Sequence, residues 1–408
     1  MNILISILGL AVLILLHEAG HFFVARGVGM RPRRFYLGFP PALAKVSRNG
    51  IEYGVGAIPL GGYVKIPGMH RPAASDLDAQ LARALAEETS LFPKAARVKR
   101  GLEAGDLDAA RDALPELQQA VEEANLSPAA AKAAHRAVEE LQDGLSADAY
   151  WRQRTWKRIA VIFAGPGVNI IVAVVLLSAG YMFGVPGNAD RTVRNVKPST
   201  PAASVGLQPG DRIIAVNARA TPNFDAVSQV IRASKGKPTT ITVQRDGRVL
   251  TLGPVRTQRI GDRWALGFEP GWEEIKYGPI GALRHSLGTT WSATKVTLTF
   301  FPHLVTGSGR KEVSSPVGIV DVSSQAVSLT FTLFLQIMGL ISLSLAILNL
   351  LPLLPLDGGH ILFSIIEGIR GRAVGREIYE RVSAIGIALF LVLTFIGLSN
   401  DINRLGGG

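Results

Sequence analysis

Four apolar runs constrain this chain more than any other feature of its sequence. A helix that crosses a lipid bilayer needs about 20 predominantly apolar residues. Runs of that kind cover residues 3–25, 159–185, 329–351 and, with a less complete apolar character, 382–398. The first run lacks a basic start and a small-residue cleavage site, so we expect it to be retained and not removed as a signal peptide. The runs predict an α-helical polytopic membrane protein with four transmembrane helices.

Ionisable residues interrupt the first run in an H-E-x-x-H pattern formed by His17, Glu18 and His21. Positions i and i+4 of a helix share one face, so the two histidines can hold one zinc ion while Glu18 acts as general base. Structural histidines with satisfied hydrogen bonds are the alternative. At the depth of the bilayer each ionisable group costs roughly 2.5–3.5 kcal/mol on insertion scales, which favours a function. We therefore expect a zinc site here.

The net charge of +11 suggests a nucleic-acid partner at first, but basic residues gather beside the apolar runs. The three clusters lie within residues 26–34, 152–158 and 370–381. They fall on one side of a membrane if the four helices cross alternately. The positive-inside rule makes that side cytoplasmic, with both chain ends outside. We expect a lipid bilayer around the chain and no nucleic-acid partner.

Short alternating runs at residues 51–55 and 63–66, separated by Gly and Pro, predict small β-hairpins after the first helix. Because they follow the metal-binding helix directly, we expect them at the membrane surface beside the site. An exposed strand edge there can pair with an extended peptide. A purely structural hairpin explains the pattern equally well.

A different composition marks residues 70–150, which hold fifteen acidic and nine basic residues. Stretches rich in Ala, Leu and Glu at 79–88, 106–125 and 128–144 predict short soluble helices. No catalytic group of residues stands out there. We expect a structural helical bundle, with an interaction or regulatory role as the alternative.

Three residues of the second run indicate close helix packing. Gly165 and Gly167 have no side chain to separate two helices, and Asn169 is a polar group that needs a partner inside the bilayer. An interhelical hydrogen bond is the expected role of Asn169.

Residues 188–260 return to a mixed pattern of strands and turns. A short helix, a Gly-Asp turn and a strand follow one another within 199–217, a second helix is predicted at 224–233, and a hairpin follows it. This arrangement resembles a PDZ domain with a permuted strand order, a module that captures extended peptides. The amphipathic stretch that follows is expected to lie on the outer membrane surface.

A zinc hydrolase needs a third protein ligand and an open position for water, and the chain has no Cys to supply it. Asp357 is the best candidate, because it closes the third apolar run before a Gly-Gly pair that lets backbone approach closely. A helix cap is its alternative role. Pro352 and Pro355 are expected to interrupt the helix, which a membrane tolerates only where backbone lines a cavity. Asn349 can then hydrogen-bond an extended substrate.

Together, HEAGH, AGPGVN at 164–169, the PDZ-like pattern and NLLP with LDGG at 349–359 resemble the site-2 protease family, in particular its bacterial regulator-of-sigma-E type of intramembrane zinc metalloprotease. LGGYVKIPG at 60–68 and SSPVGIV at 314–320 extend the resemblance over nearly the whole chain. It implies that His17, His21 and Asp357 bind zinc and that Glu18 is the base. The residues implied in substrate contacts are Tyr53, Gly61, Gly62, Asn349 and Pro352.

Three features depart from the family pattern. The chain has room for one PDZ domain where the sigma-E type carries two. The insert at 70–150 has no matching family segment. Leu354 stands where the family's second proline is expected, with Pro355 one residue later.

These predictions divide the chain into eight segments. They are transmembrane helix 1 with HEAGH (1–25), a membrane-associated β-hairpin region (26–69), a cytoplasmic helical insert (70–150), transmembrane helix 2 (151–187), one extracytoplasmic PDZ domain (188–260), an amphipathic extracytoplasmic linker (261–327), transmembrane helix 3 with the LDG motif (328–359), and a cytoplasmic loop with transmembrane helix 4 (360–408).

By this resemblance we expect a multi-pass zinc metalloendopeptidase of the bacterial plasma membrane, with its active site near the cytoplasmic side. Expected substrates are single-span membrane proteins such as anti-sigma factors or remnant signal peptides, and the PDZ domain can hold a peptide ligand. A catalytically silent PDZ adaptor and a zinc transporter are the alternatives. A missing Glu18 or Asp357 would favour the adaptor, and ligands repeated along several helices would favour the transporter. The chain has neither feature.

Overall fold

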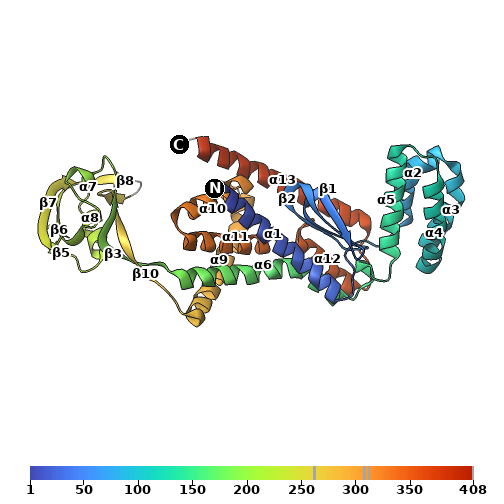
Figure 1. Ribbon diagram of the computed structural model, residues 1–408, viewed down its shortest axis with the longest axis horizontal. Coiled ribbons are helices and arrows are strands. Elements are labelled where there is room, and N and C mark those ends of the chain that lie inside the picture. The colour runs from blue at the N-terminus through green and yellow to red at the C-terminus, as the bar shows by residue number, and fades with distance from the viewer. Residues whose placement is uncertain (261–262, 307–308, 311–312, 407–408) are drawn as a thin grey trace. The chain divides into compact units, whose positions relative to one another are not determined.

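The computed structural model describes residues 1–260, 263–306, 309–310 and 313–406. It divides into a membrane unit, Met1–Leu177 with Ser286–Gly408, and a sheet unit, Ser178–His285. Among the described residues, four helices are long and apolar enough to cross a membrane (Figure 1). The four predicted spans are thus confirmed as helices. They are α1 (Asn2–Gly27), α6 (Thr155–Phe183), α11 (Phe331–Asn349) and α13 (Arg376–Gly406).

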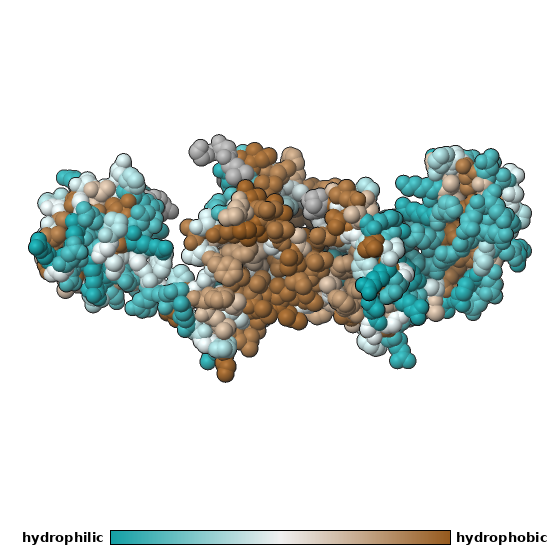
Figure 2. Space-filling model, in the orientation of Figure 1, coloured by the Kyte–Doolittle hydropathy of each residue, from teal (hydrophilic) through white to brown (hydrophobic). Residues whose placement is uncertain are grey.

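The outer surface of these helices is hydrophobic, as the brown atoms of Figure 2 show. On α1 the exposed side chains include Ile3, Leu8 and Phe23, whereas His17 and His21 are buried. Polar groups inside and apolar groups outside are the reverse of a water-soluble helix. This arrangement suits a helix whose outer face contacts lipid.

A folded hairpin follows α1 and consists of β1 (Arg34–Arg48) and β2 (Ile51–Lys65). Asn49 and Gly50 join them with positive φ angles of 52° and 75°, as a tight two-residue turn requires. Residues 34–37 of β1 pair with 62–65 of β2 on one side and with 52–55 on the other. The predicted strand character of 51–55 and 63–66 is confirmed, but both runs belong to one long strand, β2, which pairs with β1 along both parts of its length.

The same hairpin exposes large apolar side chains, among them Phe39, Leu43 and Val46. Apolar surface of this kind suits contact with lipid. Residues 62–65 pair with β1 on one side only. They therefore form one edge of the small sheet.

Four helices with a core of Leu, Ala and Val make up the insert. Figure 1 shows them side by side. The predicted helices at 79–88, 106–125 and 128–144 overlap three of them. The remaining helix, α3 (Phe92–Ala104), has no counterpart among the predictions. The helices are α2 (Ala74–Glu87), α4 (Leu107–Glu123), α3 (Phe92–Ala104) and α5 (Pro128–Leu145), with 3-10 turns η1 (Thr89–Leu91) and η2 (Tyr150–Arg152).

The sheet unit has its own core, in which Ile213, Val227 and Ile241 are fully buried. Its strands lie in the order β10-β3-β4-β6-β7, and β5 pairs with β4. The strand β10 belongs to this sheet, because it pairs with β3, more than 70 residues earlier in the sequence. The sheet unit therefore extends beyond the predicted domain end at residue 260. The elements are β3 (Val185–Val196), α7 (Pro201–Ser204), β4 (Arg212–Val216), β5 (Arg219–Ala220), α8 (Phe224–Ala233), β6 (Pro238–Arg245), β7 (Arg248–Arg256), β8 (Gln258–Ile260), β9 (Arg263–Ala265) and β10 (Phe268–Ile275).

Two helices, α9 (Pro279–Thr306) and α10 (Pro316–Leu329), occupy much of the predicted linker, of which residues 261–262, 307–308 and 311–312 lie outside the described residues. On α9 the exposed residues Ile280, Leu287 and Trp291 recur at helical spacing, which is typical of a helix at a membrane surface. The start of α10 is held by Asp401 of α13, whose Oδ2 accepts hydrogen bonds from the backbone N–H groups of Ser315 and Gly318.

Candidate active site

Three side chains from distant parts of the chain meet in the membrane unit. His17 and His21 lie on α1, and Asp357 is the first residue of α12 (Asp357–Arg370). The Nε2 atoms of the two histidines are 3.2 Å apart, and Oδ2 of Asp357 lies 3.3 Å from the first and 3.4 Å from the second. In the part of the chain that the structure describes, this is the one group of three possible metal ligands. The three predicted ligands are thus brought together.

The triangle of ligand atoms has the size of a zinc site. A tetrahedral ion with ligands at about 2.0–2.1 Å separates the ligand atoms by about 3.3 Å. Oδ2 of Asp357 is buried, and among the described residues its near polar neighbours are the two imidazoles. Three facing atoms with free lone pairs need a cation between them, and imidazole with carboxylate is a set that zinc binds. The residues present therefore fit zinc.

Each histidine is oriented by a group on α6. The Nδ1 of His21 donates a hydrogen bond to the carbonyl of Val161 at 2.8 Å, which leaves its Nε2 free for metal. The side-chain amide of Asn169 lies against His17, with Nδ2 3.3 Å from Nδ1. A metal on Nε2 leaves the proton on Nδ1, so the amide then presents its carbonyl Oδ1, which is otherwise buried without a partner. The predicted interhelical role of Asn169 is confirmed, and its partner is His17, one of the three candidate metal ligands.

The helices α1 and α6 approach each other through glycine. A Cβ on Gly165 would overlap Nε2 of His21, and a Cβ on Gly20 would lie 2.6 Å from the carbonyl oxygen of Ala164. The predicted role of Gly165 is thus confirmed. Gly167 has no such role, because the only side chain near it belongs to Phe163 of its own helix.

The loop before Asp357 is held in place by α13. The helix α11 ends at Asn349, and residues 350–356 are not helical, so the interruption expected from the two prolines is present. Gly386 of α13 packs directly on the carbonyl of Leu354, and the Tyr379 hydroxyl is hydrogen-bonded to Nδ1 of His360. The sequence contains no signal for these two contacts, because they join segments whose separate patterns are only those of helices.

Glu18 lies beside the ligands and touches the hairpin. A Cβ on Gly62 would overlap Cγ of Glu18 and would lie 2.8 Å from its Cδ. Gly62 therefore borders Glu18 at the edge of the sheet, whereas a Cβ on Gly61 would meet the ring of Phe39. Tyr53 instead lies within the sheet, between Phe35 and Val46, and its ring packs 6.0 Å from that of Phe22.

The remaining predicted substrate residues lie at the start of the loop before Asp357. Asn349 is the last residue of α11 and is half-buried, and Pro352 is exposed three residues later. Both are close in sequence to the third ligand, but no contact joins either of them to His17, His21 or Asp357 among the described residues.

Sequence comparison relates the whole chain to known proteases. The model of Peptidase family M50 matches residues 5–393. The regulator of sigma-E protease RseP of Escherichia coli K12 is 30% identical over 98% of this chain and 98% of its own length. The regulator of sigma-W protease RasP of Bacillus subtilis 168 is 28% identical over 96% of each chain. The zinc metalloprotease RasP of Oceanobacillus iheyensis is 28% identical over 98% of each. With a match that reaches all four membrane helices and a ligand triangle of this geometry, the chain belongs to Peptidase family M50 and is a zinc metalloendopeptidase of the site-2 protease type.

Proposed function

We propose that this metalloendopeptidase cuts single-span membrane proteins within the bilayer, and that its substrates are anti-sigma factors already shortened outside the membrane or remnant signal peptides. The observation that carries the proposal is the position of the ligands. His17 and His21 lie on the buried face of an apolar helix long enough to span the membrane. The names of the relatives, as regulators of sigma-E and sigma-W, support a role in sigma-factor control.

The chemistry divides between zinc and the chain's own residues. Zinc, when bound, lowers the pKa of a water molecule to about 7 and polarises the scissile carbonyl. The carboxylate of Glu18 takes a proton from the attacking water and delivers it to the leaving amine. Val161 and Asn169 hold the two imidazoles in the tautomer that binds metal. Burial of both histidines excludes bulk water from the ligands.

A transmembrane substrate has to unwind before it is cut, because its peptide bonds are hydrogen-bonded within a helix. The edge segment 62–65 is suited to hold it extended by strand addition. Gly62 lets this edge lie directly against Glu18, because it has no side chain to displace the carboxylate, and Gly61 precedes it in the same strand. Asn349 offers a side-chain amide to the same peptide, and Pro352 keeps the backbone beside it out of the helix. Tyr53 contributes by packing the sheet against α1.

The basic clusters support a sidedness in which the hairpin and the insert are cytoplasmic and the sheet unit is extracytoplasmic. The active site then lies near the cytoplasmic side. The strand order of the sheet unit, with α8 beside it, supports a PDZ domain that includes β10. We propose that this domain binds a peptide and controls access to the site. The zinc-transporter alternative has no support, since the described residues hold a single ligand group.

The test is cleavage of a model single-span substrate by the purified enzyme in bilayers, with zinc measured on the same sample. We expect one zinc per chain, cleavage that a chelator stops, and a Glu18→Gln variant that keeps zinc and loses about 10²–10⁴-fold in kcat. Wild-type cleavage by Glu18→Gln would show that the mechanism is wrong. Cleavage of soluble peptides but of no single-span substrate would show that the substrate class is wrong, and an enzyme that cuts neither would be the silent adaptor.

A further inference from the structure

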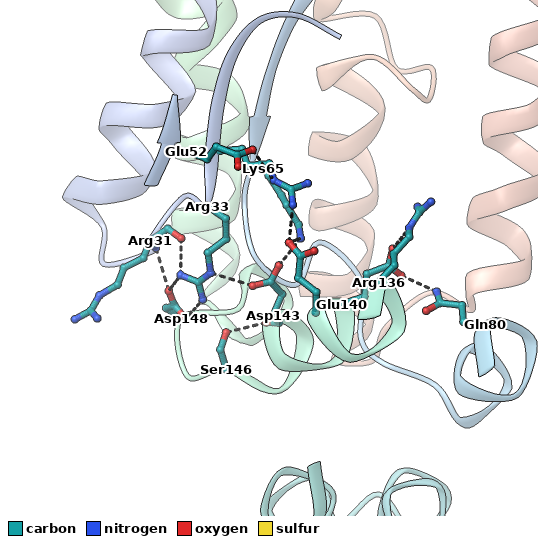
Figure 3. A network of polar contacts seen from close by, with 12 residues as sticks. Arg31, Arg33, Glu52, Lys65, Gln80, Arg136, Glu140, Asp143, Ser146 and Asp148 are labelled. Carbon is teal, nitrogen blue, oxygen red and sulfur yellow. Dashed lines mark hydrogen bonds and ion pairs between the residues drawn. The ribbon is translucent and has the colours of Figure 1, made fainter. Parts of the chain in front are cut away.

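Ion pairs join the helical insert to the base of the hairpin (Figure 3). At their centre is Asp143 of α5, whose Oδ1 lies 2.9 Å from Nε of Arg33 and whose Oδ2 lies 2.8 Å from Nζ of Lys65. Glu139 is 2.7 Å from the same Nζ, and Asp148 is 3.3 Å from Arg33. The side chains of Asp143 and Lys65 are 9% and 16% exposed. Solvent therefore screens this pair much less than a surface pair.

Of the two cations that Asp143 holds, Lys65 ends β2 and Arg33 directly precedes β1. The backbone N–H of Arg33 donates to the carbonyl of Lys65 at 2.7 Å, and Arg34 is the register partner of Lys65. Burial opposes the protonation of Lys65, but its contacts with Asp143 and Glu139 outweigh burial and raise its pKa. Lys65 thus stays charged. The carboxylate of Asp143 contacts both Lys65 and Arg33, and so fixes the edge segment against β1 at the position where Arg34 and Lys65 are paired.

Register decides what faces the catalytic base. Gly62 lies opposite Leu37, three residues from Lys65, and its Cα has no room for a side chain because Glu18 is there. A slip of one residue turns every side chain of a strand to the other face. It would bring Gly61 or Tyr63 to the place of Gly62, and a Tyr63 ring does not fit where a single Cβ overlaps. Glu18 therefore opposes the slip that brings in Tyr63. The slip that brings in Gly61 instead moves Lys65 by one residue and turns it to the other face, away from Asp143.

We propose that Asp143 is a positioning residue for proteolysis, which holds segment 62–65 in the register that keeps Gly62 against Glu18. The insert is then part of the device that presents a peptide to the base. Asp143 acts through Arg33 and Lys65 and not by contact with substrate. This inference rests on the proposed use of segment 62–65 as the substrate-binding edge.

Disulfide cross-linking measures the register without reference to catalysis, and the chain has no Cys of its own. Phe35 and Val64 are register partners, so the full-length Phe35→Cys/Val64→Cys protein should cross-link readily. Tyr36→Cys/Val64→Cys, offset by one residue in the direction that brings Tyr63 to the place of Gly62, should not. We expect Asp143→Asn to lower the yield of the first pair at least threefold and to raise that of the second. Glu116→Gln, which breaks the exposed Arg97–Glu116 pair within the bundle, should change neither.

Activity is measured on the same variants without the added Cys residues. We expect Asp143→Asn and Lys65→Gln each to lower kcat/KM for a model single-span substrate at least tenfold while zinc stoichiometry stays at the wild-type value. The double variant should lose no more than either single one, because both remove the same contact. Lys65→Arg should keep most activity. If Asp143→Asn loses zinc, and so has not folded, Lys65→Gln decides, since its change is on the strand itself.

Wild-type cross-linking yields and wild-type kcat/KM in Asp143→Asn and Lys65→Gln would overturn the proposal. A register shift in Asp143→Asn together with a wild-type enzyme that cuts no single-span substrate would separate the two ideas. In that case the register role of Asp143 stands, and the proposed substrate class fails.

Discussion

Asn169 is fully buried, and its side chain sits between two helices rather than at the end of one. The hydroxyl of Ser342 on α11 donates to its backbone carbonyl at 2.8 Å, so the residue is held from one helix while its amide faces His17 of another. The sequence predicts that a polar group at this depth needs a partner. It does not identify the partner, because that depends on how three helices are rotated about their axes.

Replacing Asn169 with Leu should lower zinc affinity about 10–100-fold, the usual effect of removing a residue that orients a metal ligand. Leu keeps a similar volume but leaves Nδ1 of His17 without an acceptor. Competition with a metal chelator measures the affinity. Ser342→Ala removes a hydrogen bond from the same helix contact but none from His17, and it should change affinity less than threefold. Equal affinities in the wild type and in Asn169→Leu would contradict this role.

Gly165→Ala should remove zinc and activity together. The added methyl group would occupy the position of Nε2 of His21, and the backbone of α6 cannot move away without breaking the contact at Gly20. Gly167→Ala is a matched control two residues away, where the added group meets only a Phe163 side chain on the same helix. It should keep zinc and activity. Bound zinc is read by metal analysis of the purified variants, and zinc retained by Gly165→Ala would refute the expected overlap.

Among the helices and strands, those set by a local sequence pattern could be predicted, whereas those set by pairing between distant segments could be predicted only in part. The four membrane helices are predictable because about 20 apolar residues in sequence carry the whole signal. The hairpin is only partly predictable. Residues 34–37 pair with one segment on each side. The turn at Asn49-Gly50 and the path of the chain between residues 55 and 62 decide which two segments these are. The strand β10 was missed for a similar reason, since its Pro and Gly resemble a loop until β3 pairs with it.

The edge segment should tolerate no side chain at Gly62. In Gly62→Ala the new methyl group displaces Glu18, so we expect kcat to fall at least tenfold while zinc, which Glu18 does not bind, is retained. Gly27→Ala, in open space at the end of the helix that carries Glu18, should behave as wild type. Cleavage kinetics and zinc analysis on the same preparations test this. An active Gly62→Ala enzyme would show that the hairpin moves away from Glu18 during the reaction.

For the whole molecule, the meeting of His17, His21 and Asp357 could be predicted from the sequence, and much of what holds them in place could not. HEAGH and LDGG are short motifs whose chemistry can be read directly, so His17, His21, Glu18 and Asp357 follow from residue types and spacing. Gly386, which packs on the loop before Asp357, and Tyr379, which is hydrogen-bonded to His360 of α12, carry no motif. Both residues reach their partners only when α13 packs against this part of the chain. The sequence of one helix does not show which other segment it will contact.

The sheet unit should lose stability in acid through Asp211. Burial opposes ionisation of this carboxyl, but the Arg245 guanidinium and the backbone N–H of Gln208 outweigh burial and hold its pKa below the ordinary value. A lowered native pKa contributes stability above the unfolded pKa of about 4, and the contribution disappears as pH falls through the native pKa.

We therefore expect Asp211→Asn to destabilise the unit by about 1–3 kcal/mol at pH 7, where it leaves buried donors poorly paired. The difference between variant and wild type should shrink as the pH falls below about 4. Hydrogen exchange of β4 and β6 in the full chain, compared at each pH, measures it. A difference that is constant with pH would contradict the assignment.

The ligand triangle also has a consequence for synthesis. His17 and His21 leave the ribosome more than 300 residues before Asp357, which follows only after two further apolar runs, an insert and a sheet unit have been made. Until then α1 carries two imidazoles and a carboxylate with no third ligand. The nascent chain therefore passes through the insertion machinery, next to many other single-span segments, as an inactive precursor. Proteolytic activity can arise only once Asp357 has joined the two histidines.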